Sequence, residues 1–379
     1  MDKNARIRSI VSIVIFVMII GILTIVSMVK EDDGFSENEN RILAQKPEFS
    51  VDELINGSYI EDYQDYIRDQ FPWRDEMVKL KNVCELFFGK SMVNGVLIAE
   101  DDYYIESHER ENYESELAET NAEALISFIN RHKETLGEDR VSAMIVPTAQ
   151  SIMTNKFSSF MYAYNQQEYI LPIKEKIGNS FIDVTEVLKS KNDEYIYYRT
   201  DHHWTTYGAY IAYAEWASRV GITPYTEDEL EIKDITKEFY GTIDSKINLD
   251  TKADIIKSYE VKGMKYNIVY NMSEEKNTFF FDEFLDKKDK YSYFLGGNPG
   301  LVEVKGTSDN DRKLLIVKDS YANCISPVYA GHFENTYILD LRYFNMRIDD
   351  FISEYGITDI LVLYNVDIFA TDKYVKRIR

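Results

Sequence analysis

The chain has 379 residues, of which 45% are hydrophobic and 28% charged, so it can bury a large core and is not globally disordered. Its 43 Lys and Arg residues stand against 65 Asp and Glu residues, giving a formal net charge of −22. This acidic excess excludes a nucleic-acid binder, because neutralising phosphates requires clustered Lys and Arg. Cys84 and Cys324 are too few for a disulfide framework or a zinc finger. We expect two separate thiols, with a pairing as the alternative.

An uncharged segment lies near the N-terminus, from Ser9 to Val29, and reads SIVSIVIFVMIIGILTIVSMV. At about 1.5 Å per residue, this helix would be about 31 Å long, roughly the thickness of the bilayer core. Basic residues precede it and acidic residues follow it: Lys3, Arg6 and Arg8, then Glu31, Asp32 and Asp33. The positive-inside rule therefore predicts a single-pass plasma-membrane protein with residues 1–8 in the cytoplasm and the rest outside. The segment does not end in small residues typical of a cleavage site, which favours an uncleaved anchor over a signal peptide.

Residues 30–50 are polar and predict a tether between the anchor and one catalytic domain over residues 51–379. Apolar residues at helical spacing in 51–82 predict two helices separated at Pro72. Alternating apolar residues with glycine punctuation in 88–105 predict hairpins.

Helices and strands then alternate, which predicts an α/β fold. The predicted strands are short apolar runs at 141–146, 181–184, 314–317, 337–339 and 360–363. The predicted helices cover 113–136, 204–220, 321–330 and 349–355. Residues 223–300 are β-like and irregular, and they predict an insertion covering one edge of the core.

The first candidate site is the run Asp201-His202-His203-Trp204, where an extended segment meets a helix. A carboxylate that orients an imidazole produces an activated general base. Helix capping by Thr200 or Asp201 is an alternative, but it gives no reason for two adjacent histidines. A metal site is a further alternative, although the remaining histidines are scattered. We expect neither a metal nor a cofactor.

The second candidate site is Ser320, which follows the apolar strand 314–317 and precedes a helix. The carboxyl ends of strands are where α/β folds place their sites. The backbone N–H of Tyr321 could stabilise an oxyanion, together with Gly297 or Asn298 in the upstream loop. Alone, this pattern is common to many α/β proteins.

Together, these residues resemble the DHHW protein family, whose signature is the Asp201–Trp204 run. The resemblance extends over most of the chain beyond the anchor, in the segments Ser36–Ser50, Asp69–Asp75, Phe87–Val96, Phe294–Asn298 and Lys318–Asn323. The family is similar to the SGNH-hydrolase-like alginate O-acetylation proteins, which implies a three-layer sandwich with a permuted order of the triad. The resemblance implies Asp201 as the triad aspartate, His203 as the base and Ser320 as the nucleophile.

The resemblance leaves other residues as candidates for contacting the substrate or the oxyanion: His202, Trp204, Tyr321, Asn323, Gly297 and Asn298. Lys318 replaces the glycine that usually precedes Asp-Ser in SGNH hydrolases, so the oxyanion geometry is expected to differ. The implied function is an O-acetyltransferase or acetylesterase acting on a cell-wall or exported polysaccharide. Relatives of this kind work beside a membrane-bound O-acyltransferase, which is the implied partner. The alternative is a non-catalytic protein that binds glycan or organises an assembly.

Overall fold

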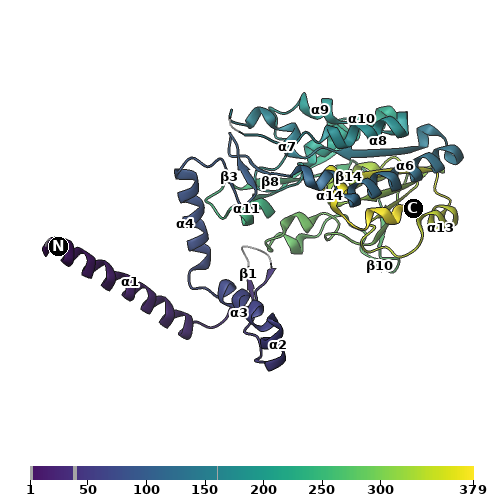
Figure 1. Cartoon of the computed structure of the whole chain (residues 1–379). Helices are drawn as coiled ribbons and strands as arrows, with labels where there is room; N and C mark the ends of the chain where they lie inside the picture. Colours follow the sequence, from purple (N-terminus) through teal and green to yellow (C-terminus); the bar gives the residue numbers. More distant parts are fainter. Residues whose placement is uncertain (1–2, 37–40, 160) are drawn as a thin grey trace. The chain divides into compact units, whose positions relative to one another are not determined.

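The computed structural model describes residues 3–36, 41–159 and 161–379 (Figure 1). The chain divides into two compact units, Met1–Gly89 and Lys90–Arg379. The larger unit therefore begins later than residue 51, where the catalytic domain was predicted to start. Cys84 is exposed and Cys324 is buried, and both are free thiols, as predicted.

Helix α1, Lys3–Val29, contains the predicted anchor. Its part from Arg6 to Val29 is long and apolar enough to cross a membrane, and none of it is buried against the protein. These 24 residues extend over about 36 Å.

The rest of the smaller unit contains three helices, α2 (Val51–Asn56), α3 (Ser58–Asp69) and α4 (Arg74–Phe87). Helices α2 and α3 are separated at Gly57, whose φ of 93° suits glycine. Helices α3 and α4 are separated around Pro72, as predicted.

The segment 30–50, predicted to be a tether, is attached to these helices. It contains a short ladder of β1 (Phe35–Ser36) and β2 (Arg41–Ile42). The Arg41 guanidinium donates two hydrogen bonds of 2.7 Å to Asp69 at the end of α3. The Arg41 hydrogen bonds lower the pKa of the Asp69 carboxyl to about 2, so the pair stays charged. This bidentate ion pair orders a segment whose polar composition resembles a linker.

The larger unit is built on a seven-stranded sheet with the order β10-β9-β11-β13-β12-β14-β6. Its strands are β6 (Val141–Val146), β9 (Asn267–Tyr270), β10 (Glu274–Glu275), β11 (Leu301–Lys305), β12 (Lys313–Lys318), β13 (Asn335–Leu339) and β14 (Asp359–Asn365). The neighbours β13, β12, β14 and β6 run parallel, and β11, β9 and β10 add antiparallel pairs. This mixed α/β sheet confirms four of the five predicted strands.

Successive residues of the central strands enter two different hydrophobic cores. Leu314 and Ile316 of β12 belong to one core, whereas Leu315 and Val317 belong to the other. The sheet is therefore buried on both faces, which explains why its strands read as continuous apolar runs.

Helices contribute to both cores. The first core includes residues of α9 (Thr185–Lys189), α10 (Thr206–Arg219) and α12 (Ser326–Ala330). The second includes residues of α6 (Glu116–Leu136), α8 (Gln167–Ile177), α13 (Ile348–Tyr355) and α14 (Val366–Thr371). The short helices α5 (Arg110–Tyr113) and α7 (Ala149–Ile152) lie in connecting segments.

Two predicted elements are shorter than expected. Residues 181–184 form no strand but a single bridge between Phe181 and Ala143 of β6. Residues 321–330 form a 3₁₀ turn, η7 (Ser320–Ala322), followed by the five-residue α12. The predicted hairpins at 88–105 are confirmed as a three-stranded sheet of β3 (Met92–Val93), β4 (Val96–Ile98) and β5 (Tyr104–Glu106).

The predicted insertion at 223–300 is only partly an insertion. Strands β7 (Leu230–Phe239) and β8 (Asp254–Val261) pair with each other outside the main sheet, and α11 (Thr242–Ile247) connects them. Strands β9 and β10, by contrast, belong to the main sheet, with β10 at its edge and β9 next to it. Strand β10 has only two residues, both exposed, and the four residues of β9 alternate between buried and more exposed positions, so neither strand forms a continuous apolar run.

Candidate active site

The Asp201–His203 segment is a tight loop between two paired residues. Tyr197 and Trp204 form an antiparallel bridge, and the Tyr198 N–H donates to the His203 carbonyl at 3.2 Å. Helix α10 then starts at Thr206, capped by the side chain of Thr205. The loop therefore presents its side chains just before the helix, and the cap is neither Thr200 nor Asp201.

Asp254, at the start of β8, holds the beginning of this loop. Its carboxylate is fully buried and accepts hydrogen bonds from the Thr200 N–H at 2.8 Å and the Thr200 hydroxyl at 2.6 Å. It also accepts from the Arg199 N–H at 3.0 Å and the Tyr195 hydroxyl at 2.5 Å. Four donors fix the backbone directly before Asp201, and nothing in the sequence pattern indicated Asp254.

Ser320 lies immediately beyond the carboxyl end of β12. The preceding Asp319 caps the turn, because one of its carboxylate oxygens accepts from the Tyr321 N–H at 2.9 Å. The other oxygen accepts from the backbone and side-chain amides of Asn365, at 2.9 and 2.6 Å, where β14 ends. These bonds hold half-buried Ser320 at the carboxyl edge of the parallel strands, where α/β folds place their sites.

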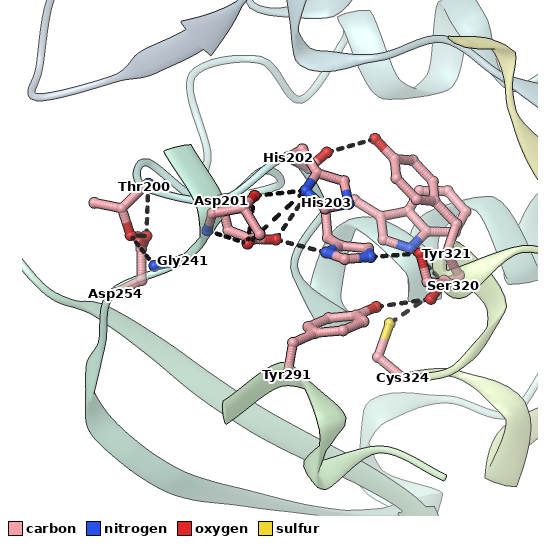
Figure 2. Close-up of polar contacts among 12 residues, drawn as sticks. Thr200, Asp201, His202, His203, Gly241, Asp254, Tyr291, Ser320, Tyr321 and Cys324 are labelled. Carbon is pink, nitrogen blue, oxygen red and sulfur yellow. Dashed lines mark hydrogen bonds and ion pairs between the residues drawn. The ribbon is translucent and has the colours of Figure 1, made fainter. Parts of the chain in front are cut away.

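The structure brings the three residues predicted as a triad together (Figure 2). His203 Nε2 lies 2.7 Å from Ser320 Oγ, and His203 Nδ1 lies 2.5 Å from Asp201 Oδ1. Asp201 and His203 are only 3% and 5% exposed. A hydroxyl, an imidazole and a carboxylate in this order can generate a serine nucleophile, with the carboxylate fixing the tautomer of the base.

The Asp201 carboxylate is held by the start of α11. Its Oδ2 accepts from the Thr242 N–H at 2.9 Å and from the Thr242 hydroxyl at 3.2 Å, while Oδ1 also accepts from the His203 N–H at 3.0 Å. Burial alone would raise the pKa of Asp201, but the imidazoles of His202 and His203 and these hydrogen bonds hold it well below its usual range. Asp201 is therefore an anion at neutral pH.

Gly241, directly before α11, makes room for this carboxylate. A Cβ atom at Gly241 would lie 2.2 Å from Asp201 Cβ and 2.4 Å from Asp201 Oδ2. Only glycine fits in this position. Gly241 and Thr242 are 40 and 41 positions from Asp201 and carry no recognisable motif, so sequence reasoning missed both.

Tyr291 contacts both His203 and the Ser320 turn. Its ring stacks on the imidazole with centroids 3.7 Å apart and an interplanar angle of 12°, and its hydroxyl donates to the Ser320 carbonyl at 3.1 Å. Tyr291 therefore contacts both the base and the serine turn. Sequence reasoning missed it among the 29 tyrosines of the chain.

Trp204 and Tyr321 tie the two candidate segments together. The Trp204 indole N–H donates to the Tyr321 carbonyl at 2.9 Å, and the Tyr321 hydroxyl donates to the His202 carbonyl at 2.8 Å. Both side chains are buried. Trp204 thus joins the loop to the serine turn, and its full burial argues against its predicted contact with substrate.

The oxyanion donor predicted at Tyr321 is already occupied, because its N–H donates to Asp319. The N–H of Ser320 itself has no hydrogen-bond partner among residues 3–36, 41–159 and 161–379. This amide, rather than that of Tyr321, is therefore the available backbone donor beside the hydroxyl.

The Gly297–Asn298 loop is bound to the serine segment through Lys318 and Asn323. The Asn298 side-chain oxygen accepts from Lys318 Nζ and from Asn323 Nδ2, both at 3.3 Å, and Asn323 Nδ2 also donates to the Gly297 carbonyl at 3.0 Å. Lys318 is fully buried and lies 3.6 Å from Asp340. Lys318 and Asn323 thus attach the loop carrying Asn298 to the serine segment, and Asn323 Oδ1 is buried with no hydrogen-bond partner among the described residues.

His202 points away from the triad axis. Its Nδ1 lies 2.7 Å from the Thr242 hydroxyl, and its ring centroid lies 4.0 Å from that of His203. Asp201, His202 and His203 could each offer a ligand atom to a metal ion, within 4.8 Å of one another. Both His203 nitrogens already face Asp201 and Ser320, so an ion there would compete with the hydroxyl–imidazole contact.

The environment of His203 predicts an unusual pH dependence. Burial and the His202 imidazole lower the pKa of His203 to about 4, although Asp201 acts in the opposite direction. Only neutral imidazole can accept the serine proton, so the titration of His203 should make kcat/KM for a small ester rise between about pH 3 and 5. We expect this result from stopped-flow rates across pH 3–8.

Asp319→Asn is the control for this profile, because burial raises the pKa of Asp319 to about 6 and its titration could add a second inflection. An inflection near pH 6 that disappears in Asp319→Asn belongs to Asp319. One that remains near pH 6.5 in that variant would contradict the depressed pKa of His203.

The DHHW protein family model matches residues 109–339. The chain is similar to a DHHW family protein from Eubacterium siraeum at 27% identity, over 76% of this chain and 95% of that one, with a TM-score of 0.64. It is also similar to Bacillus cereus PatB1, solved with a sulfonyl adduct, at 19% identity over 74% and 97% of the two chains, with a TM-score of 0.60. The O-acetyltransferase domain of Pseudomonas putida AlgJ aligns at 12% identity over 73% and 93%, with a TM-score of 0.43. No protein of curated function matches significantly.

The family match covers more than half of the chain and includes the Asp201–Trp204 run and Ser320. The fold of PatB1 extends this likeness over nearly the whole of that protein. The protein therefore belongs to the DHHW family.

Proposed function

We propose that this protein is a membrane-anchored O-acetyltransferase or acetylesterase acting outside the cytoplasm on a cell-wall or exported polysaccharide. The observation that carries the proposal is the continuous contact from Ser320 Oγ through His203 to Asp201. The sheet covered by helices on both faces supports an SGNH-like sandwich. In this sandwich the order of the triad along the chain is permuted, because Asp201 and His203 precede Ser320.

In the proposed reaction, Ser320 Oγ attacks the carbonyl carbon of an acetyl donor while His203 Nε2 takes the hydroxyl proton. The tetrahedral intermediate places its negative oxygen near the free N–H of Ser320. The bond to the donor oxygen then breaks, His203 returns the proton to that oxygen, and an acetyl-Ser320 ester remains.

An acceptor hydroxyl completes the cycle. Its oxygen attacks the acetyl carbon, His203 takes its proton, the bond to Ser320 Oγ breaks, and the proton returns to Ser320. A sugar hydroxyl gives transfer and water gives hydrolysis. Asp201 stabilises the imidazolium that forms in each half-reaction. A membrane-bound O-acyltransferase would be a suitable source of acetyl groups for a protein anchored by α1.

The topology is tested with reporters. A periplasmic-type alkaline phosphatase fused after Arg379 should be active, because Arg6 and Arg8 precede the apolar segment and acidic residues follow it. A fluorescent protein that folds only in the cytoplasm should be dark at the same position and bright when fused before Met1. The reverse pattern would overturn the extracytoplasmic assignment.

The chemistry is tested with the purified full chain in detergent. We expect acetate release from 4-nitrophenyl acetate and covalent labelling by a serine-directed phosphonate, with both lost in Ser320→Ala. A wild-type protein that neither releases acetate nor reacts with the phosphonate would support the alternative, a non-catalytic glycan-binding or assembly protein.

A further inference from the structure

We propose that a cavity of about 260 Å³ beside the triad binds one uncharged sugar ring of the acceptor polysaccharide, through His108 and His202. This inference rests on the proposed function and names its acceptor class.

The walls of the cavity are the immediate neighbours of the triad. His202 adjoins His203, Tyr321 adjoins Ser320, and Thr242 binds the Asp201 carboxylate; all three line the cavity. An occupant therefore lies next to the residues that would form and consume an acetyl-serine.

Residues at the carboxyl ends of two sheet strands also line the cavity. Thr148 follows the end of β6, Asn365 ends β14, and both line the cavity. Because β6, β14 and β12 are parallel, their carboxyl ends meet at the edge where Ser320 lies.

All lining residues but Ile368 have a hydrogen-bonding side chain, and apolar atoms of these side chains also contribute much of the exposed lining. Its members are Glu106, His108, Thr148, His202, Thr242, Lys246, Tyr321, Asn365, Asp367 and Ile368. Such a set of donors and acceptors suits an occupant covered with hydroxyl groups. The volume lies below the range of about 300–1,000 Å³ typical of drug-sized ligands, so it suits a single ring.

Two imidazoles in this lining each have one nitrogen held and one nitrogen left over. His108 Nδ1 lies 3.0 Å from Asp367, and its backbone N–H donates to Gln150 at 2.5 Å, which fixes the residue. His202 is held through Nδ1 by Thr242. In the described ranges, neither Nε2 has a protein partner, so each can hydrogen-bond a sugar hydroxyl.

The charges in the lining favour an uncharged ring. Glu106 is paired with Lys246, and Asp367 is paired with His108. The hydrogen bond and charge of His108 keep the pKa of Asp367 below its usual range despite burial, so it stays anionic. Lys246 and His108 are thus already paired with carboxylates of the lining, so neither is left to pair with a uronate carboxylate, which would also meet a chain of net charge −22.

The experiment measures binding of three tetrasaccharides to the full-length Ser320→Ala protein by saturation-transfer NMR: chitotetraose, cellotetraose and tetragalacturonate. We expect at least one neutral tetrasaccharide to bind and tetragalacturonate to bind more weakly. Adding His108→Gln or His202→Gln should weaken neutral binding about 5- to 10-fold, the effect of one hydrogen bond. The control is His132→Gln, since His132 makes a similar 3.0 Å contact with Asp349 but does not line the cavity.

A second readout uses active protein, in which His108→Gln and His202→Gln should lower the ratio of acetyl transfer to hydrolysis by a similar factor. If no neutral tetrasaccharide binds, if tetragalacturonate binds best, or if both variants match His132→Gln, the proposal is overturned. If the wild type neither transfers nor hydrolyses acetyl groups but the binding pattern holds, the proposed function has failed and the sugar site stands.

Discussion

Ser320→Ala is expected to lower kcat for ester hydrolysis by about 10⁴- to 10⁶-fold, and His203→Ala by a similar factor. Each substitution removes one end of the 2.7 Å contact through which the hydroxyl would lose its proton. Because triad members act as a unit, the double variant should be little slower than either single one. Initial rates of 4-nitrophenyl acetate hydrolysis, with acetyl-enzyme detected by mass spectrometry, measure the effect.

Ser326→Ala is the matched control. Ser326 is a buried serine in the same segment, and its hydroxyl donates to the Ala322 carbonyl at 2.8 Å, away from His203. Its loss should affect stability more than rate. Comparable rates in Ser326→Ala and Ser320→Ala, or additive losses in the Ser320/His203 double variant, would contradict the triad.

Gly241→Ala is expected to damage the site without changing any residue that contacts substrate. The added Cβ would lie 2.2 Å from Asp201 Cβ, so the carboxylate must leave its position beside His203. A misplaced triad aspartate leaves the imidazole in the wrong orientation, which costs about 10³- to 10⁴-fold in kcat. The overpacking should also lower the free energy of unfolding by about 1–3 kcal/mol. Rates at matched folded concentration, with thermal unfolding of each variant, separate the two effects.

Gly331→Ala provides the comparison. A Cβ at Gly331 would lie 2.8 Å from Val261, a similar crowding away from the triad. It should lower stability while leaving kcat per folded molecule within about twofold. A Gly241→Ala protein with normal kcat would show that Asp201 does not need its observed position.

The local pattern of apolar residues was sufficient to predict the fully buried strands and helix α10. The strands β6, β12, β13 and β14 are buried on both faces, so each appears as an uninterrupted apolar run. Helix α10 was equally clear. Strands β9 and β10 gave no such signal, because they have only four and two residues and include exposed positions.

Within the site, the sequence identified Asp201, His203 and Ser320 because their types and neighbours form a recognisable pattern. It did not identify Gly241, whose role is only to leave space, or Tyr291, one of many tyrosines. It also assigned the oxyanion donor to Tyr321, since a helix start usually has free amides. The Asp319 cap occupies that amide.

The sequence by itself determined the apolar N-terminal segment, the α/β class and the chemical types at the site, because each is encoded in residues near one another in the chain. The tertiary structure decided which of these residues meet. Ser320 and His203 are brought to 2.7 Å across 117 positions by the shared edge of the parallel strands and by the Trp204–Tyr321 contacts. The cavity with His108 could be found in no other way, because its lining comes from β5, the segment after β6, the loop before α10, α11, the serine turn, β14 and α14. Hydrogen bonds and packing between distant segments leave no periodic pattern in the sequence, so only the folded chain reveals them.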